Sequence, residues 1–170
     1  RYLSSPYAIE TDESFEFNYG EAQRVGMPVG IYFYSNAATV DEAIEEANHC
    51  LAVLKNRKID FPVYFDLETA RSKSAGAAQV SAMIDAFCST ITNGGYTAGF
   101  YVNLDTYRNY VDSNLVKKYA LWIAQYNETF DFSGPAGMWQ KTDKGTLSCL
   151  AEGVTIDINE CYVDYPSILN

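Results

Sequence analysis

The chain has 170 residues, of which 48% are hydrophobic and 20% charged, and this size and composition predict a single globular domain with a substantial core. A formal net charge of −10 disfavours binding to nucleic acid through its phosphates, and the sequence has no run of 18 apolar residues that could span a membrane. The single histidine and the four cysteines, none in a CxxC pair, favour neither a metal site nor a cofactor.

The first elements expected along the chain are two helices. Asp12 is placed to cap a helix over residues 13–25. Its expected inner stripe consists of Phe15, Tyr19, Ala22 and Val25. Thr39 and Glu42 have the spacing of a capping box, which predicts the start of a second helix that runs to about residue 56. Hydrophobic periodicity predicts further helices over about 77–92 and 105–111, and a polar loop precedes the first of these.

Six strands are expected between and after these helices, over residues 29–34, 61–68, 96–103, 119–126, 137–140 and 154–159. Strand and helix alternate through the first two-thirds of the chain, which predicts βαβ units and a parallel sheet. The last three strands lie too close together for a full helix between each pair. An open sheet is one interpretation, and an irregular TIM-like (β/α) barrel with abbreviated final units is the preferred one.

Polar and aromatic residues recur where these strands end, which is where such barrels place their active sites. They are Tyr34, Glu68, Asn103, Tyr126, Gln140 and Asp157. Tyrosine combines an apolar face with a polar tip and suits sugar binding, and the chain has 14 tyrosines. We therefore expect a site at this end of the barrel.

The strand over residues 61–68 carries the most informative pattern. Side chains alternate along a strand, so Asp66 and Glu68 face one way together with Tyr64, with Cα atoms about 6–7 Å apart. Two carboxyls this close raise each other's pKa, and an apolar setting raises both further. A solvated strand edge is the plain alternative. The preferred interpretation is a catalytic pair in which one carboxyl keeps its proton near neutral pH.

The cysteines and the histidine are interpreted as structural. Cys50 and Cys88 lie on apolar helix faces and are expected to be buried thiols, whereas Cys149 and Cys161 could pair, which the sequence leaves open. His49 sits beside the apolar stripe of its helix and has no partner motif, so it is expected to be structural or solvated.

Six segments in order along the chain resemble family 25 of the glycoside hydrolases, the Chalaropsis-type lysozymes. They are Gly30-Ile31-Tyr32-Phe33-Tyr34-Ser35, Pro62-Val63-Tyr64-Phe65-Asp66-Leu67-Glu68, Gly99-Phe100-Tyr101-Val102-Asn103, Leu121-Trp122-Ile123-Ala124-Gln125-Tyr126, Met138-Trp139-Gln140 and Ile156-Asp157-Ile158-Asn159. The resemblance spans about residues 12–169. It implies an irregular barrel and a muramidase that cleaves the β-1,4 bond between N-acetylmuramic acid and N-acetylglucosamine in peptidoglycan. Action outside the cell or at the cell wall is implied too, although residues 1–6 lack the apolar core of a signal peptide.

The resemblance also implies roles for particular residues. Glu68 matches the general acid, Asp66 its assisting partner, and Asp157 an active-site aspartate of the final strand. Substrate-binding residues are expected among the aromatic and amide side chains of the six segments, namely Tyr32, Tyr34, Tyr64, Tyr101, Trp122, Gln125, Tyr126 and Trp139. No metal or cofactor is implied. The nucleophile is either the N-acetyl group of the substrate, with Asp66 assisting, or a carboxylate in direct displacement.

One departure from the family pattern affects both fold and function. The family begins with a strand that carries Gly-Ile-Asp-Val-Ser and a further active-site aspartate, followed by a second strand, and neither motif occurs before Asp12. Residues 1–170 are therefore expected to form one catalytic domain that is incomplete at its N-terminus, with a homodimer or an exchanged segment covering the gap. The alternative function is a cell-wall glycan-binding module without activity. A metal-dependent hydrolase is disfavoured by the single histidine.

Overall fold

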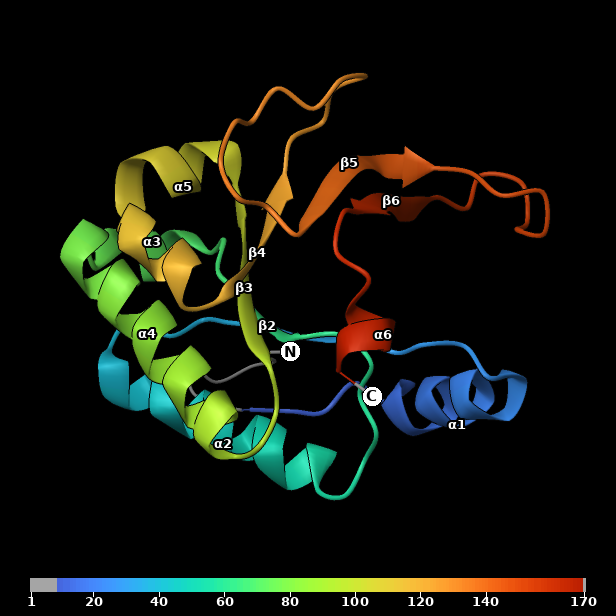
Figure 1. The fold of residues 1–170 in the computed structure, drawn as a ribbon, viewed down its shortest axis with the longest axis horizontal. Helices are drawn as coiled ribbons and strands as arrows, with labels where there is room; N and C mark the ends of the chain where they lie inside the picture. Colours follow the sequence, from blue (N-terminus) through green and yellow to red (C-terminus); the bar gives the residue numbers. More distant parts are fainter. Residues whose placement is uncertain (1–8, 170) are drawn as a thin grey trace.

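The computed structural model describes residues 9–169, which form a curled six-stranded sheet with helices packed on its outer face (Figure 1). The strands are β1 (Ile31–Tyr34), β2 (Val63–Asp66), β3 (Ala98–Asn103), β4 (Ala120–Ala124), β5 (Met138–Gly145) and β6 (Ile156–Cys161). The α-helices are α1 (Phe15–Val25), α2 (Val40–Leu54), α3 (Ala70–Ser74), α4 (Ala77–Asn93), α5 (Leu104–Tyr110) and α6 (Tyr165–Ile168), and a 3-10 helix η1 covers Ser113–Lys117.

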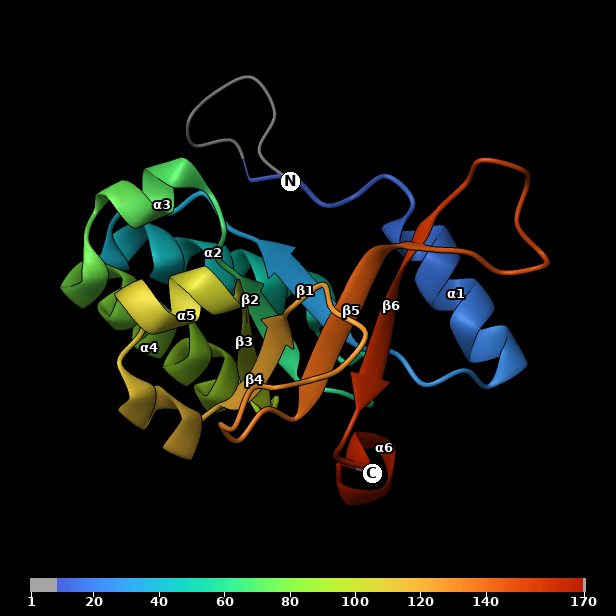
Figure 2. The same cartoon turned by 90° about the horizontal axis from the view of Figure 1, so that it is seen from above.

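The strands lie side by side in the order β1-β2-β3-β4-β5-β6. Neighbouring strands are parallel from β1 to β5, and β6 returns antiparallel to β5 with irregular register. Viewed from above, the sheet curls as part of a barrel, with the β5–β6 hairpin extending beyond the parallel strands (Figure 2). The βαβ units and the shortened last units predicted from the sequence are confirmed as a partial TIM-like barrel. Each of the six predicted strands is present, with ends displaced by a few residues.

The two faces of β2 separate the core from the inside of the curled sheet. Val63 and Phe65 belong to the hydrophobic core beneath the helices, together with Leu67 just beyond the strand. Phe65 stacks on Phe87 of α4, with ring centroids 4.4 Å apart. The alternation predicted for this strand is therefore confirmed, because Asp66 faces the opposite side. All four residues of β2 are buried, so the strand is held rigidly from both faces.

Helix α2 begins at the predicted capping residues. The Thr39 side chain accepts a hydrogen bond from the Glu42 backbone N–H at 3.2 Å. The Glu42 carboxylate reaches back one residue further than in the usual capping box and accepts from the Ala38 N–H at 2.7 Å. This pair orders the loop between β1 and α2. Cys50 in α2 and Cys88 in α4 are buried as predicted, while Cys149 and Cys161 are exposed and carry free thiols.

Helix α1 differs from its prediction. It starts at Phe15, and Ser14 is the N-cap residue. Asp12 lies before the cap, where its side chain accepts a hydrogen bond from the Ser14 N–H at 2.8 Å. No residue of α1 is fully buried. Of the expected inner stripe, Phe15 and Tyr19 are partly buried and pack against the core, whereas Val25 is 56% exposed.

Three short helices, α3, η1 and α6, were not expected from the sequence. Helix α3 occupies part of the predicted polar loop before α4, and η1 follows α5. Among residues 9–169, no helix has both the length and the apolar character needed to cross a membrane.

Candidate active site

A hollow of about 220 Å³ lies at the carboxyl ends of the strands, on the inside of the curled sheet. Its lining residues are Tyr32, Tyr34, Asp66, Glu68, Tyr101, Trp122, Tyr126, Gln140 and Asp157. They come from, or directly follow, all six strands. Residues up to 125 positions apart in sequence are thus brought together by strand order alone, as expected for a barrel of this kind.

Asp66 lies at the floor of this hollow and has the most perturbed carboxyl. It is only 6% exposed, and among the described residues no donor lies within hydrogen-bond distance of its Oδ1. Burial, followed by the charges of Glu68 and Asp157, raises the pKa of Asp66 to about 8. A pKa of about 8 favours the protonated form of Asp66 at neutral pH, and its buried Oδ1 has no hydrogen-bond partner among the described residues.

Glu68 is half-buried and belongs to the loop that follows β2. Burial raises its pKa, the Lys73 ammonium lowers it, and the Asp157 charge raises it again, with a net upward shift. The sequence predicted a raised pair from the spacing of the two carboxyls and their apolar setting. The opposing effects of Asp157, which raises the Glu68 pKa, and of Lys73, which lowers it, could not be predicted, because no local pattern links either residue to Glu68.

A hydrogen-bonded aromatic wall closes one side of the hollow. The hydroxyls of Tyr101 and Tyr126 both donate to Gln140 Oε1, at 2.7 and 3.1 Å. Trp122 Nε1 donates to Asn159 Oδ1 at 2.9 Å, which ties β4 to β6. The Trp122 ring also meets the edge of Tyr101 at a centroid distance of 4.6 Å. These contacts fix the rings in place before any ligand arrives.

The structure brings together eight of the eleven site residues predicted from the sequence, and the hollow's lining leaves out the other three, Tyr64, Gln125 and Trp139. Tyr64 is 2% exposed and packs below Trp122, at 5.3 Å between centroids. Gln125 Nε2 donates to Asp131, away from the hollow. Trp139 is 2% exposed and lies on the outer face of β5, where Phe130 stacks on it.

Two residues of the site were absent from the predicted set of catalytic and binding residues. Gln140 lines the hollow and organises two tyrosines, and Asn159 orients Trp122. Both could have been found from alternation, because Gln140 ends a predicted strand and Asn159 shares a face with Asp157. Within residues 9–169, no three His, Cys, Asp or Glu side chains are grouped so that they could hold a metal ion.

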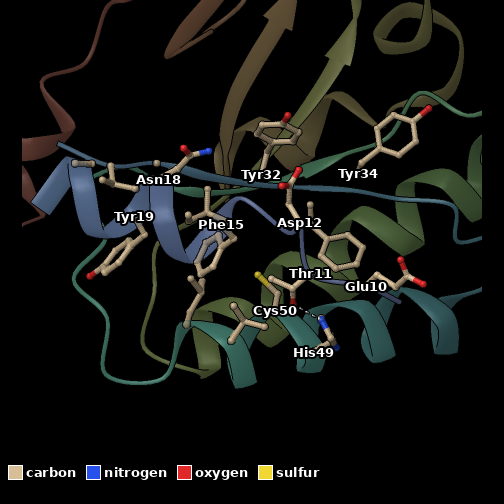
Figure 3. Close-up of a pocket in the computed structure, with 17 residues that line it drawn as sticks. Glu10, Thr11, Asp12, Phe15, Asn18, Tyr19, Tyr32, Tyr34, His49 and Cys50 are labelled. Carbon is tan, nitrogen blue, oxygen red and sulfur yellow. Dashed lines mark hydrogen bonds between the residues drawn. The ribbon is translucent and has the colours of Figure 1, made fainter. Parts of the chain in front are cut away.

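A second and larger hollow, of about 620 Å³, lies between α1, α2 and the edge strand β1 (Figure 3). Phe15 and Tyr19 line it from α1, and Cys50 lines it from α2. His49 also lines it, with Nε2 3.3 Å from Thr11 Oγ1 and its ring edge-on to Phe33. The walls of this hollow are mainly apolar, in contrast to the smaller one.

With this geometry established, comparison with known proteins identifies the class. Residues 8–149 match the model of Glycosyl hydrolases family 25, and the chain belongs to that family. The resemblance inferred from the six segments is therefore confirmed. A search of the curated proteins gives no match.

Solved structures with the same fold include endolysins and a lysozyme. The CTP1L endolysin superposes with a TM-score of 0.80 and 26% identity, over 95% of this chain and 56% of that one. The catalytic domain of the endolysin ply40 from bacteriophage P40 of Listeria monocytogenes gives 0.74 and 25% identity, over 94% and 80% of the two chains. A bacterial lysozyme from Streptomyces coelicolor shares the fold, with a TM-score of 0.72 and 18% identity. The match covers 91% of this chain and 76% of the lysozyme. The chain thus spans little more than half of the CTP1L endolysin.

Proposed function

We propose that this chain hydrolyses the glycan strands of peptidoglycan as a muramidase, cutting the β-1,4 bond between N-acetylmuramic acid and N-acetylglucosamine. The observation that carries the proposal is the pair Asp66 and Glu68, two carboxyls with raised pKa values in an aromatic hollow of a family 25 chain. Its structural neighbours, which are endolysins and a lysozyme, agree with this function. The proposed substrate places its action at the cell wall, outside the cell.

Glu68 is the proposed general acid. A glycosidic oxygen must receive a proton as it leaves, and the donor must be reachable from the substrate side. Glu68 is half-buried at the hollow and has a raised pKa, whereas Asp66 is buried at its floor. This arrangement favours Glu68 as the donor and Asp66 as the group beneath the reacting sugar.

Asp66 and Asp157 are proposed to act on the other side of the reaction. A positively charged, oxocarbenium-like centre lowers the free energy of ionising a nearby carboxyl, so its approach favours the ionised form of Asp66, whose proton passes to solvent water. Asp157 lies across the hollow on β6, where it adds negative charge to the same space. The substrate's own N-acetyl group, oriented by Asp66, is the proposed nucleophile.

The proposed sugar contacts are the side chains that line the hollow. The exposed rings of Tyr32 and Tyr126 are 61% and 53% accessible, and Trp122 lies between them with its ring edge held. Tyr34 and Tyr101 complete the rim. Trp139 and Tyr64 are assigned to support this wall from behind, because both are 2% exposed.

The test is digestion of purified peptidoglycan by the chain, with the soluble products identified by reductive labelling and mass spectrometry. Products that end in reducing N-acetylmuramic acid would support the proposal. Products that end in reducing N-acetylglucosamine would replace it with a different bond specificity. Saturable binding to cell walls with no product would favour the glycan-binding module instead.

We also propose that a second copy of the chain covers the larger hollow at the β1 edge. The hollow has mainly apolar walls and borders β1, at the edge of the sheet. Contiguous apolar surface of this kind is typical of an interface. Light scattering over a range of concentrations is expected to show a dimer, and a monomer at every concentration would overturn this proposal.

A further inference from the structure

Helix α3, which was not expected from the sequence, begins two residues after Glu68 and is fixed by its own arginine. The Thr69 side chain caps the helix by accepting from the Ser72 N–H at 3.2 Å. Arg71 then extends away from α3 to the loop between β1 and α2. Upstream of Glu68, the Leu67 N–H donates to the Tyr101 carbonyl at 3.1 Å. The backbone of Glu68 is therefore anchored on both sides.

The Arg71 guanidinium donates hydrogen bonds to three oxygen atoms, two of Glu42 and one of Asn36. Nη1 and Nη2 donate to the two carboxylate oxygens of Glu42, at 2.8 and 2.9 Å, and Nη1 also donates to the Asn36 carbonyl. The same Glu42 carboxylate accepts from the Ala38 N–H. Such a planar, bidentate pair fixes direction as well as distance, which a lysine cannot do.

The loop that Arg71 contacts follows β1, the strand next to β2 in the active site. It follows Tyr34, which lines the hollow together with Glu68. A buried carboxylate, Glu46, holds the same loop from below, because Ser35 Oγ donates to it at 2.7 Å and the Asn36 N–H at 3.2 Å. Arg71 thus connects the segment that presents Glu68 to the segment that presents Tyr34.

Burial distinguishes this ion pair from the other bidentate arginine pairs of the molecule. The side chains of Arg71 and Glu42 are 29% and 15% exposed, whereas those of Arg24 and Glu21 in α1 are 66% and 46% exposed. A pair in open water is screened and contributes little, but one shielded from solvent can hold two loops in register. The Arg24 pair therefore offers a matched control with the same chemistry far from the site.

We propose that Arg71 is a positioning residue that fixes Glu68 against Tyr34 through its bidentate contact with Glu42. The inference rests on the proposed function, because Glu68 is the group it positions. Arg71 does not line the hollow and touches no substrate. Its effect is transmitted through the backbone of residues 68–71, a short and direct path.

The test compares Arg71→Met, Arg71→Lys and the control Arg24→Met. With peptidoglycan, Arg71→Met is expected to lower kcat about 10- to 100-fold with little change in KM, because a misplacement of about 1 Å has effects of this size. Arg71→Lys keeps the positive charge but loses the planar, bidentate contact with Glu42. Its kcat is therefore expected to lie between those of Arg71→Met and the unaltered chain. Arg24→Met is expected to match the unaltered chain. Circular dichroism and melting curves establish that each variant is folded.

A merely structural role would slow every substrate alike, so an activated substrate separates the two explanations. An aryl glycoside with a dinitrophenyl leaving group needs no proton from Glu68, and Arg71→Met is expected to reduce its hydrolysis less than about threefold. Equal loss on both substrates, or no loss on peptidoglycan, would overturn the positioning role.

A readout that does not depend on turnover keeps this inference separate from the proposed function. Titration of ¹³C-labelled glutamate by NMR is expected to show a different pKa for Glu68 in Arg71→Met and the unaltered value in Arg24→Met. An unchanged Glu68 titration would overturn the inference. Failure of the unaltered chain to digest peptidoglycan would instead count against the proposed function alone.

Discussion

The two hollows beside β1 differ in size and in what they can do. The larger, about 620 Å³, lies between two helices and one strand and has mainly apolar walls. The smaller, about 220 Å³, takes residues from all six strands or the loops after them and contains three carboxyls. Tyr32 and Tyr34 line both, so one strand takes part in two very different surfaces. Volume alone would select the larger hollow, whereas the proposed catalytic carboxyls line the smaller one.

The difference follows from how each hollow is built. Carboxyl ends of parallel strands converge, and the backbone hydrogen bonds of the sheet hold them rigidly, so polar groups can be placed close together at little conformational cost. The larger hollow depends on α1, which has no buried residue and is held to the loop after α2 by contacts such as the Arg57–Glu16 pair. The candidate active site is therefore distinguished by polar groups held close together on a rigid sheet, and not by the volume of its hollow.

The largest effect is expected when Glu68, in the smaller hollow, is replaced by Gln. The amide keeps the shape of the side chain but cannot donate a proton to a leaving oxygen, so hydrolysis of peptidoglycan is expected to fall about 10²- to 10⁴-fold. The release of reducing ends measures the rate. Glu45→Gln, an exposed change on α2, is the control and is expected to be silent. More than a few per cent of residual activity in Glu68→Gln would exclude Glu68 as the acid.

A second test concerns the stability of the smaller hollow. The pKa of Asp66 is about 8 in the folded chain against an ordinary value near 3.8, so the folded state binds the proton more tightly. Stability from this group is full below pH 4 and is lost as the pH rises to about 8. Asn cannot ionise, so Asp66→Asn is expected to gain stability relative to the unaltered chain over that range, on the order of a few kcal/mol at pH 8.

Urea unfolding at pH 4, 6 and 8 measures this gain, with the exposed Asp143→Asn as control. A stability difference between Asp66→Asn and the unaltered chain that does not change with pH would show that Asp66 titrates normally. Activity is expected to fall in the same variant. A stabilised but inactive protein is the behaviour expected where function requires a buried, unfavourable charge.

A smaller effect is expected from Asp157→Asn. The Asp157 charge raises the pKa values of both Asp66 and Glu68, so its removal is expected to lower both. NMR titration of the labelled carboxyls detects the shift. Glu152→Gln, an equal loss of charge in the exposed loop between β5 and β6, is expected to change neither value. Unchanged titrations in Asp157→Asn would remove Asp157 from the charge network.

The parts of the molecule predicted correctly depend on local periodicity. Alternation along β2 separates Phe65 in the core from Asp66 in the site, and the spacing of Thr39 and Glu42 marks the start of α2. These patterns need only neighbouring residues. The alternation would also have found Asn159, had it been applied to β6 as fully as to β2.

The sequence predictions were wrong where a residue far away in the sequence determines how a segment packs. Trp139 was expected to contact sugar, but Phe130, from the loop before β5, covers its ring, and no local pattern in β5 indicates that contact. Helix α3 has only five residues, too short for a periodic signal, and its Arg71 pairs with Glu42 from another helix. The stripe on α1 is periodic in sequence, yet a stripe becomes core only where another element packs on it.

The smallest effect is expected from a substitution in the larger hollow. Tyr19 lines it, its hydroxyl donates to the Lys58 carbonyl at 3.3 Å, and Arg57 lies over its ring at 5.1 Å. Tyr19→Leu removes both contacts and is expected to lower the free energy of unfolding by about 1 kcal/mol, which corresponds to a fall in Tm of about 2–4 °C, with kcat unchanged. Thermal melting and the peptidoglycan assay measure the two quantities on one sample. A loss of kcat without loss of stability would show that the larger hollow communicates with the smaller one through β1, and the division between them would no longer hold.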